Sequence, residues 1–142
     1  MDDIDRRIVA LLRENARRSF KNIGGHVGLS APAVKRRVDR LEADGVIRGY
    51  TAMVDPRAFG WHAEAFVDLY CEGAMPADSI KRAVEGEPGV VSAHTVAGEA
   101  SALLHIMAGD TQDLETCLER IRATDGISRT VTEVVLSTLF KR

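Results

Sequence analysis

The sequence predicts an α+β protein of two domains: an N-terminal helix-turn-helix (winged-helix-like) domain at 1–45 and a C-terminal ferredoxin-like βαββαβ domain at 64–142, joined by a strand and linker at 46–63. Three observations predict this. The first domain has helical periodicity interrupted by a glycine turn, and the second alternates strand and helix patterns. The third is charge: residues 1–60 hold 12 Lys and Arg against 8 Asp and Glu, whereas residues 61–142 hold 7 against 13. The formal net charge is therefore +4 in the first part and −6 in the second. This difference indicates a polyanion-binding module attached to a module of another kind.

Length and composition exclude several classes of protein. A chain of 142 residues that is 45% hydrophobic and 28% charged resembles ordinary globular proteins rather than disordered ones. No apolar run approaches the roughly 18 residues of a membrane span, and no signal peptide opens the chain, so we expect a cytoplasmic protein without membrane contact. Cys71 and Cys117 lie in apolar stretches, which favours reduced core thiols over a disulfide.

The first two helices follow from periodicity and caps. Apolar residues at i, i+4, i+7 and i+8 from Ile4 predict a helix from about residue 2 to 14. Ser19 is an N-cap for a second helix, residues 20–27, and Gly28 suits a left-handed C-cap. Within that helix we expect Gly24 to mark a close crossing by another helix, while Gly25 has no explanation from sequence.

A third helix is predicted from Ser30 to Ala43, with Pro32 in its first turn. The turn before it has three or four residues including glycine, as in a helix-turn-helix. At 100° per residue, one stripe is apolar (Val34, Val38, Leu41). The opposite stripe carries Pro32, Ala33, Arg36, Arg40 and Ala43.

The outward stripe has the chemistry of groove entry into double-stranded DNA. Its N-terminal end is small and uncharged, so it can approach base edges, and the basic residues behind it can reach phosphates or guanine. The predicted DNA-binding residues are Ser30, Ala31, Pro32, Ala33, Lys35, Arg36, Arg37 and Arg40. An ordinary solvated face, with Asp39 and Glu42 partly neutralising the cations, is the alternative.

The remaining elements are predicted in chain order. "VIRGYTAMVDP" predicts a strand that ends at Asp55-Pro56. Strands are then expected at 64–71, 90–96, 101–108 and 130–140, and helices at 76–86 and 111–123. We expect Ala77, Ile80 and Val84 to face inward from the first of these helices, and Leu114, Cys117, Leu118 and Ile121 from the second.

A βαββαβ order places both helices on one face of an antiparallel sheet. The other face should alternate polar with apolar if water covered it, yet "ALLHIMA" and "VVLSTLF" are apolar at nearly every position. A second copy is the expected cover, which predicts a homodimer.

The stretch "LSAPAVKRRVDRLEADGVIRGYTAMVDP", preceded by "DDIDRRIVALLRENAR" and followed by "VAGEASALL", resembles the Lrp/AsnC family, the feast/famine transcription regulators. The resemblance spans essentially the whole chain. It implies an N-terminal DNA-binding domain, a C-terminal effector and oligomerisation domain, dimers that assemble to octamers, and an amino acid or related small-molecule effector bound where dimers meet.

The resemblance also implies an effector loop. The family pattern G-x-x-D followed by an aromatic residue corresponds to residues 98–102, with Gly98, Glu99 and Ser101 as candidate effector-binding residues. Ser101 departs from the pattern, because a serine hydroxyl brings no charge to an amino acid's ammonium group. Thr130 and Thr132 match family positions that line the same pocket, and packing within a strand explains them equally well.

Three alternatives stay open. The Ser101 departure favours an effector-independent, nucleoid-organising DNA-binding protein. A sirohaem-decarboxylase-like enzyme shares the fold, but the arginines crowd the first domain while the acidic second half would repel a polycarboxylate porphyrin. The third is a metal site at His94 and His105, placed opposite each other on a hairpin and joined by Cys71 or Glu99. We therefore expect no catalytic residue, cofactor or metal.

Overall fold

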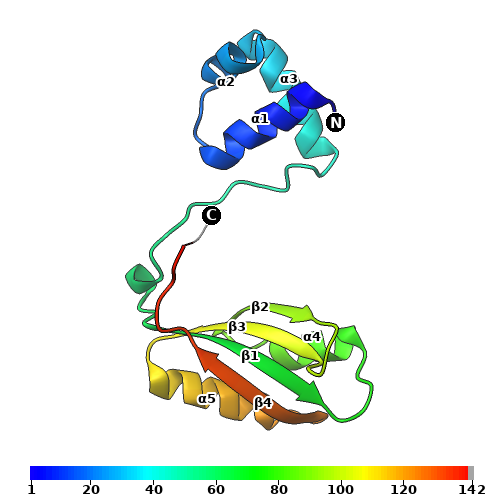
Figure 1. The fold of residues 1–142 in the computed structure, drawn as a ribbon, viewed down its shortest axis with the longest axis vertical. Helices are drawn as coiled ribbons and strands as arrows, with labels where there is room; N and C mark the ends of the chain where they lie inside the picture. Colours follow the sequence, from blue (N-terminus) through cyan, green and yellow to red (C-terminus); the bar gives the residue numbers. More distant parts are fainter. Residues whose placement is uncertain (141–142) are drawn as a thin grey trace. The chain divides into compact units, whose positions relative to one another are not determined.

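The computed structural model describes residues 1–140. It divides into two compact units, one from Met1 to Met53 and one that begins at Val54. The N-terminal unit holds three helices, α1 (Asp3–Glu14), α2 (Phe20–Val27) and α3 (Ala31–Ala43) (Figure 1). All three match the predicted segments to within a residue, because each carries its own periodicity and cap.

The caps of α2 act as predicted. The Ser19 hydroxyl accepts a hydrogen bond from the Asn22 N–H at 3.2 Å, and Gly28 adopts the left-handed conformation with φ 71°. Ser30 occupies the N-cap position of α3, but its side chain makes no capping hydrogen bond. A small core holds the helices together, formed by buried Ile8, Leu12, Ile23, Val27, Val34 and Val38.

The reason for Gly24 differs from the one predicted. A Cβ atom at this position would collide with the carbonyl oxygen of Leu29, in the turn before α3, rather than with a crossing helix. The Leu29 N–H also donates to the Gly24 carbonyl at 3.0 Å. Gly24 therefore lets the turn fold tightly against α2.

The prediction of a strand at "VIRGYTAMVDP" is wrong. Residues 46–55 form no strand, and the N–H groups of Val46 and Ile47 instead donate to the carbonyl of Leu41 at the end of α3. A strand needs a neighbouring strand for its hydrogen bonds, and no described segment pairs with this one. A short 3₁₀ helix, η1 (Pro56–Phe59), follows at the start of the second unit.

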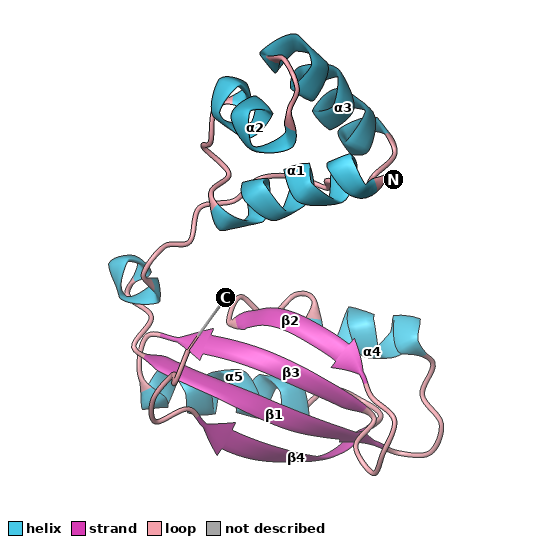
Figure 2. Ribbon diagram, turned by 45° about the horizontal axis from the view of Figure 1, so that its top comes forward, coloured by secondary structure: helices cyan, strands magenta, loops and turns pink. Residues whose placement is uncertain are grey.

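The C-terminal unit has the predicted βαββαβ order. Its elements are β1 (Ala63–Cys71), α4 (Ala77–Val84), β2 (Val90–Thr95), β3 (Ala102–Ala108), α5 (Thr111–Arg122) and β4 (Ile127–Val134). The four strands form one sheet in the order β2-β3-β1-β4, with antiparallel neighbours, and Figure 2 shows both helices behind it. This is the ferredoxin-like arrangement.

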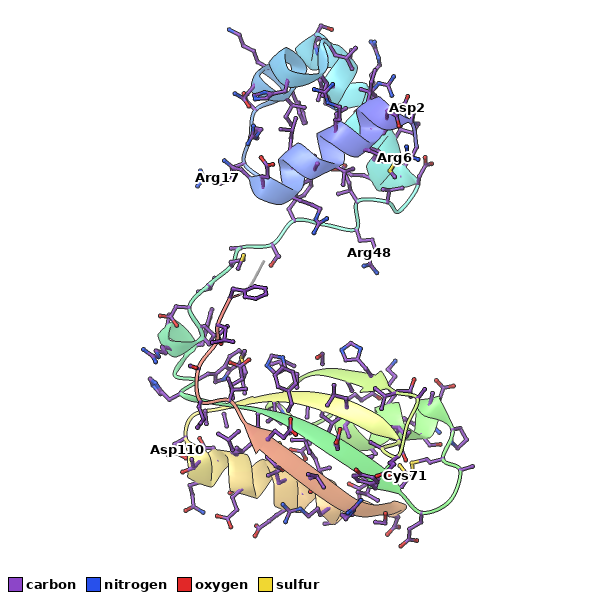
Figure 3. The ribbon with its side chains drawn as sticks, viewed as in Figure 1. Asp2, Arg6, Arg17, Arg48, Cys71 and Asp110 are labelled. Carbon is purple, nitrogen blue, oxygen red and sulfur yellow. The ribbon has the colours of Figure 1, made fainter. Side chains whose placement is uncertain are left out.

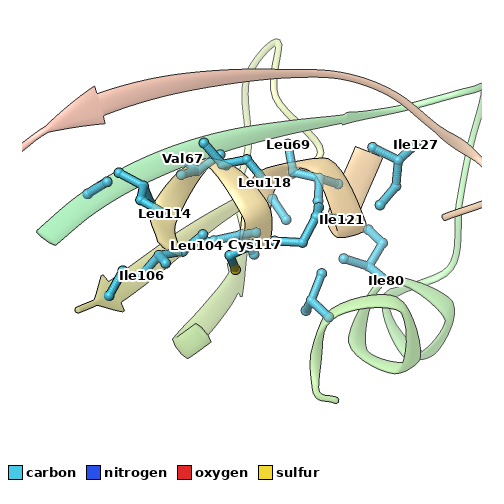
Figure 4. Packing of buried hydrophobic residues seen from close by; sticks show 14 residues of the cluster. Val67, Leu69, Ile80, Leu104, Ile106, Leu114, Cys117, Leu118, Ile121 and Ile127 are labelled. Carbon is cyan, nitrogen blue, oxygen red and sulfur yellow. The ribbon is translucent and has the colours of Figure 1, made fainter. Parts of the chain in front are cut away.

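The core of this unit lies between the sheet and the two helices (Figure 4). Buried Val67, Leu69, Leu104 and Ile106 meet Ile80 and Val84 of α4. From α5 come Leu114, Cys117, Leu118 and Ile121, all buried as predicted. Ala77 is exposed, contrary to prediction, because it is the first residue of α4 and lies beyond the end of the core.

The final strand is shorter than predicted. β4 ends at Val134, so most of "VVLSTLF" is not strand, and Leu136 and Leu139 are more than nine-tenths exposed. These apolar residues are thus not covered within one copy of the chain, and their cover by a second copy stays a prediction. In β3 the residues alternate, so that Leu104 packs in the core while Leu103 lies on the open face of the sheet.

The open face of the sheet mixes aromatic and charged side chains. Phe66 stacks on His105 at 4.8 Å between ring centroids, and His105 Nε2 lies 2.6 Å from Glu64 Oε1. Arg129 lies over the ring of Tyr70 at 4.0 Å. This face is therefore neither a second hydrophobic core nor an evenly polar surface.

Candidate DNA-binding and effector sites

α3 buries one stripe and presents the other to solvent. Val34, Val38 and Leu41 are at most 2% exposed, as the sequence predicted. Ser30 and Pro32 are exposed, and Ala31 and Ala33 are half-buried, so the start of the helix presents a small, uncharged surface. No acidic residue lies in the first turn of α3. An anionic partner therefore meets no repulsion at this end of the helix.

The four predicted cations of α3 differ in what they contact. Lys35 forms an exposed ion pair with Asp39 at 2.6 Å. Arg36 is exposed and makes no hydrogen bond or ion pair with any described residue. Surface pairs of the Lys35 type contribute little and exchange readily. Arg36 is therefore the cation of α3 most available to an external anion.

Arg37 and Arg40 turn back toward α1. Arg37 Nη1 lies 2.7 Å from both Asp2 Oδ2 and Asp5 Oδ1, and Arg40 Nη2 lies 2.8 Å from Asp5 Oδ2. The Asp5 side chain is 1% exposed, whereas that of Arg40 is 54% exposed. Arg37 thus acts within the domain, while Arg40 retains a surface toward solvent.

Asp2, Asp5 and Arg37 stabilise one another in their charged forms. The hydrogen bond from Arg37, together with the Asp5 N–H, lowers the pKa of Asp2 from 3.8 to about 2. Burial alone would raise the pKa of Asp5, but hydrogen bonds from the Asp2 N–H and Arg37 outweigh it and lower that pKa. The same contacts with Asp2 and Asp5 raise the pKa of Arg37. All three groups stay charged at neutral pH.

Asp5 was missed by the sequence argument, although two signals pointed to it. It lies at i, i+3 and i+7 with Ile8 and Leu12, so an acid occupies the apolar stripe of α1. With Asp2 it also forms a reciprocal capping box, with hydrogen bonds of 3.0 and 2.8 Å. An acid within a buried stripe predicts a basic partner from elsewhere in the fold.

Further basic side chains surround this unit. Arg13, Arg17, Lys21 and Arg48 make no side-chain ion pair with any described residue, and Figure 3 shows Arg17 and Arg48 projecting outward. Tyr50 lies beyond α3 and donates to Glu42 at 2.7 Å. Burial and that contact raise the pKa of Tyr50 to about 12, so it remains a neutral donor.

The candidate effector loop lies beside the end of β1. Gly98 has φ 152°, which favours glycine, and Glu99 is exposed without an ion-pair partner among the described residues. The Ser101 N–H donates to the Leu69 carbonyl at 2.8 Å, and its hydroxyl oxygen accepts from the Cys71 N–H at 3.1 Å. Ser101 therefore holds the loop against β1.

Thr130 and Thr132 lie along the other edge of β1. They pair with Leu69 and Val67, on the side of the sheet that the helices cover. The Thr130 hydroxyl accepts a hydrogen bond from Arg122 Nε of α5 at 2.9 Å. Leu69 pairs with Thr130 on one side and with Ala102, at the end of the 98–102 loop, on the other. No hydrogen bond joins either threonine to the loop within the described chain.

The two histidines do not form the predicted opposed pair. His94 lies opposite Leu103 and His105 opposite Ser92, so they are diagonal neighbours. Among residues 1–140, no group of three or more His, Cys, Asp or Glu side chains is placed to hold a metal ion. Over the same range, no helix is long and apolar enough to cross a membrane.

These features define a class of protein: a helix-turn-helix unit whose third helix presents an unpaired arginine, followed by a ferredoxin-like unit with a glycine loop at one end of its sheet. Comparison with known proteins narrows this class. Residues 1–42 match the AsnC-type helix-turn-helix domain, and residues 64–142 match the Lrp/AsnC ligand binding domain.

Relatives cover the full chain. The HTH-type transcriptional regulator Rv2324 of Mycobacterium tuberculosis is 49% identical over 100% of this chain and 96% of its own. Among solved structures, AsnC of E. coli superposes with a TM-score of 0.90 at 25% identity, covering 100% of this chain and 96% of that one. A feast or famine regulatory protein (Rv3291c) of M. tuberculosis, complexed with L-methionine, does so with a TM-score of 0.90 at 36% identity, covering 99% and 95%.

The chain belongs to the Lrp/AsnC family of transcriptional regulators. The resemblance seen in the sequence is thereby confirmed, as is the two-part α+β fold. Members of this family are transcriptional regulators and not enzymes, which decides against the decarboxylase alternative.

Proposed function

We propose that this regulator reads its DNA site with α3, placing Ser30, Ala31, Pro32 and Ala33 against base edges in the major groove. Arg36 carries the proposal, because it is exposed and unpaired on the outward stripe. A guanidinium in that position can bind guanine bidentately or neutralise a phosphate. Lys35 leaves Asp39 and pairs with a phosphate of the DNA instead. Arg40 contacts the DNA with the part of its side chain that is exposed, and Arg37 holds α3 in position.

The DNA site is expected to be a rough palindrome bound by a homodimer. Dimers of helix-turn-helix proteins contact half-sites about one helical turn, or a multiple of it, apart. The open face of the sheet supports self-association, since Phe66 is 39% exposed there and Leu103 is only half-buried without helices to cover it. We propose that these dimers assemble further into an octamer.

A small-molecule effector of the amino acid class is proposed at the 98–102 loop, with Thr130 and Thr132 at the same end of the sheet. The methionine complex of a relative makes L-methionine the first compound to test. In this chain Ser101 brings no carboxylate, and Glu99 is the only acid in the loop. We therefore propose weak binding of common amino acids.

An effector-independent, nucleoid-organising role is the second candidate, and the Ser101 contact favours it. Its hydroxyl oxygen is already engaged by the Cys71 N–H, which leaves it less available to a ligand. Both candidates place the protein in the cytoplasm, on the nucleoid.

Footprinting on the DNA upstream of its own gene tests the proposal. Protection of paired half-sites, lost in Arg36→Ala, supports groove reading by α3. Uniform protection along the DNA, unchanged by amino acids, favours the nucleoid-organising role. Absence of any salt-dependent DNA binding would contradict both.

A further inference from the structure

A hollow of about 260 Å³ lies in the second unit, between η1 and the segment that follows β4. Figure 1 shows the chain after β4 running beside η1, the short helix that precedes β1. One side of the hollow holds Arg57, Trp61 and His62, and the other is the segment Val135–Thr138; we call it the Trp61 hollow.

The Trp61 hollow is separate from the candidate effector loop. Glu64, at the start of β1, lines the hollow, whereas Leu69, near the end of β1, pairs with Ala102 beside the loop. Five residues of extended strand separate Glu64 from Leu69, which is about 17 Å. The hollow and the loop therefore lie at opposite ends of the sheet.

Backbone hydrogen bonds hold both sides of the hollow in place. The Trp61 N–H donates to the Pro56 carbonyl at 3.1 Å, which fixes the turn after η1. Across the hollow, the Val135 N–H donates to the Glu64 carbonyl at 2.8 Å, which fixes the segment after β4 to β1. The fold thus builds this hollow from anchored backbone on both sides.

The polar side chains of the hollow leave hydrogen-bond donors unused. Its two acids are engaged within the chain: Asp55 Oδ1 accepts from the Arg57 N–H at 3.0 Å, and Glu64 Oε1 lies 2.6 Å from His105 Nε2. Four other side chains make no hydrogen bond or ion pair with residues 1–140, those of Arg57, His62, Ser137 and Thr138. A guanidinium, an imidazole and two hydroxyls together favour a ligand that brings acceptors, such as a carboxylate.

The apolar part of the hollow is formed around Trp61. Its ring lies 6.0 Å from that of Phe59 between centroids, and Met107 and Leu136 also line the hollow. Leu136 is 95% exposed, so a ligand with an apolar body would remove this side chain and part of the indole from water. The ligand should therefore combine a carboxylate with an apolar group.

We propose that the Trp61 hollow binds a small monocarboxylate with an apolar body, of about the size of phenylacetate. Arg57 binds the carboxylate, the hydroxyls of Ser137 and Thr138 donate to it, and the apolar body lies against Trp61. Pockets for drug-sized molecules measure about 300–1,000 Å³, so a hollow of about 260 Å³ suits a smaller ligand. This inference goes beyond the proposed function, because the site involves neither α3 nor the 98–102 loop.

Trp61 is the only tryptophan of the chain, so its fluorescence reports on this hollow. Titration of the full-length protein with phenylacetate should change the emission and reach saturation. Phenylethylamine, which has the same ring but an ammonium group in place of the carboxylate, should not. Calorimetry with the same two compounds measures the affinity independently of fluorescence.

Arg57→Ala tests the proposed contact with the carboxylate. The variant should bind phenylacetate roughly tenfold or more weakly, about the loss of one charge-assisted hydrogen bond. Thr138→Val, which removes a hydroxyl at nearly constant volume, should weaken binding less. Arg82→Ala is the matched control, since Arg82 is an exposed arginine of α4 outside the hollow. Circular dichroism checks that each variant keeps its fold.

Three results would overturn the proposal. One is the absence of both a saturable change in emission and a heat of binding at millimolar phenylacetate, which is also the result expected if a second copy of the chain fills the hollow. Another is equal binding of phenylacetate and phenylethylamine, since the hollow would then not select a carboxylate. The third is wild-type affinity in Arg57→Ala.

Discussion

The buried carboxylate of Asp5 in α1 accepts a hydrogen bond from the guanidinium of Arg37 in α3, with 2.7 Å between Oδ1 and Nη1. This contact joins α1 to α3, and its two residues lie 32 positions apart in the sequence. It fixes the orientation of α3 relative to α1, and with it the direction in which Arg36 points. A residue of the first helix thereby positions the proposed reading helix.

Asp5→Asn should destabilise the N-terminal unit. The change removes the charge that Arg37 and Arg40 both contact, and a buried hydrogen bond to a charged group contributes about 2 kcal/mol. Thermal or urea unfolding measures the loss. Asp3→Asn is the control, because Asp3 pairs only with Arg6 at the surface and should change stability little. Equal stability of the two variants would contradict the role given to Asp5.

The stability of the N-terminal unit should fall in acid. The pKa of Asp2 is lowered from 3.8 to about 2, and that of Asp5 is also lowered. A carboxylate with a depressed folded pKa stabilises the fold above its unfolded pKa, and that stabilisation is lost as pH falls through the folded value. Unfolding measured from pH 5 downward should therefore show a decline that begins near pH 4 and continues toward about pH 2. Asp2→Asn should flatten that decline; an unchanged profile would argue against the ion pairs.

Arg36→Ala should weaken operator binding more than Arg40→Ala. Arg36 is free to contact DNA, whereas Arg40 is shared with Asp5. Removing an arginine that reads a base costs about 1 to 3 kcal/mol, or roughly 5- to 150-fold in affinity. Footprinting or anisotropy measures it, and circular dichroism checks that the fold is intact. Arg82→Ala on α4 is the control. A larger loss for Arg40→Ala would mean that the Asp5 contact opens on DNA.

Leu103→Asp should disrupt the proposed dimer. Leu103 lies on the open face of the sheet, directly opposite Asp68, so a second copy would bury the new carboxylate beside another one. Light scattering at micromolar concentration should show no monomer for wild type, and monomers or aggregates for the variant. Gln112→Asp, on the exposed side of α5, should keep the wild-type mass. A monomeric wild type would contradict self-association through the sheet.

Ser101→Asp should strengthen binding of at least one amino acid. The new carboxylate can receive an ammonium group, and such a charge-assisted hydrogen bond contributes about 1.5 to 3 kcal/mol, or roughly 10- to 150-fold in affinity. Calorimetry with L-methionine first and then the other common amino acids measures it. Micromolar binding by wild type that survives Glu99→Gln would show that the ammonium is held elsewhere.

Local features of the sequence were enough to predict most elements. The bounds of α1, α2, α3 and α5 follow from periodicity, N-caps such as Ser19 and the left-handed Gly28, because helical hydrogen bonds close within four residues. The family signature was equally local, since it lies in consecutive residues of the helix-turn-helix. So was the stripe of Val34, Val38 and Leu41, whose burial depends only on helical spacing.

Contacts between distant residues needed the folded chain. β-propensity at residues 46–55 and 135–140 did not make strands, because a strand forms only where a neighbour supplies its hydrogen bonds. Which arginine of α3 stays free was likewise decided by the fold, since it depends on where α1 places Asp5. Spacing along a helix shows that Arg36 and Arg37 point in different directions, but only the packing of α1 against α3 gives Arg37 an acid and leaves Arg36 to solvent.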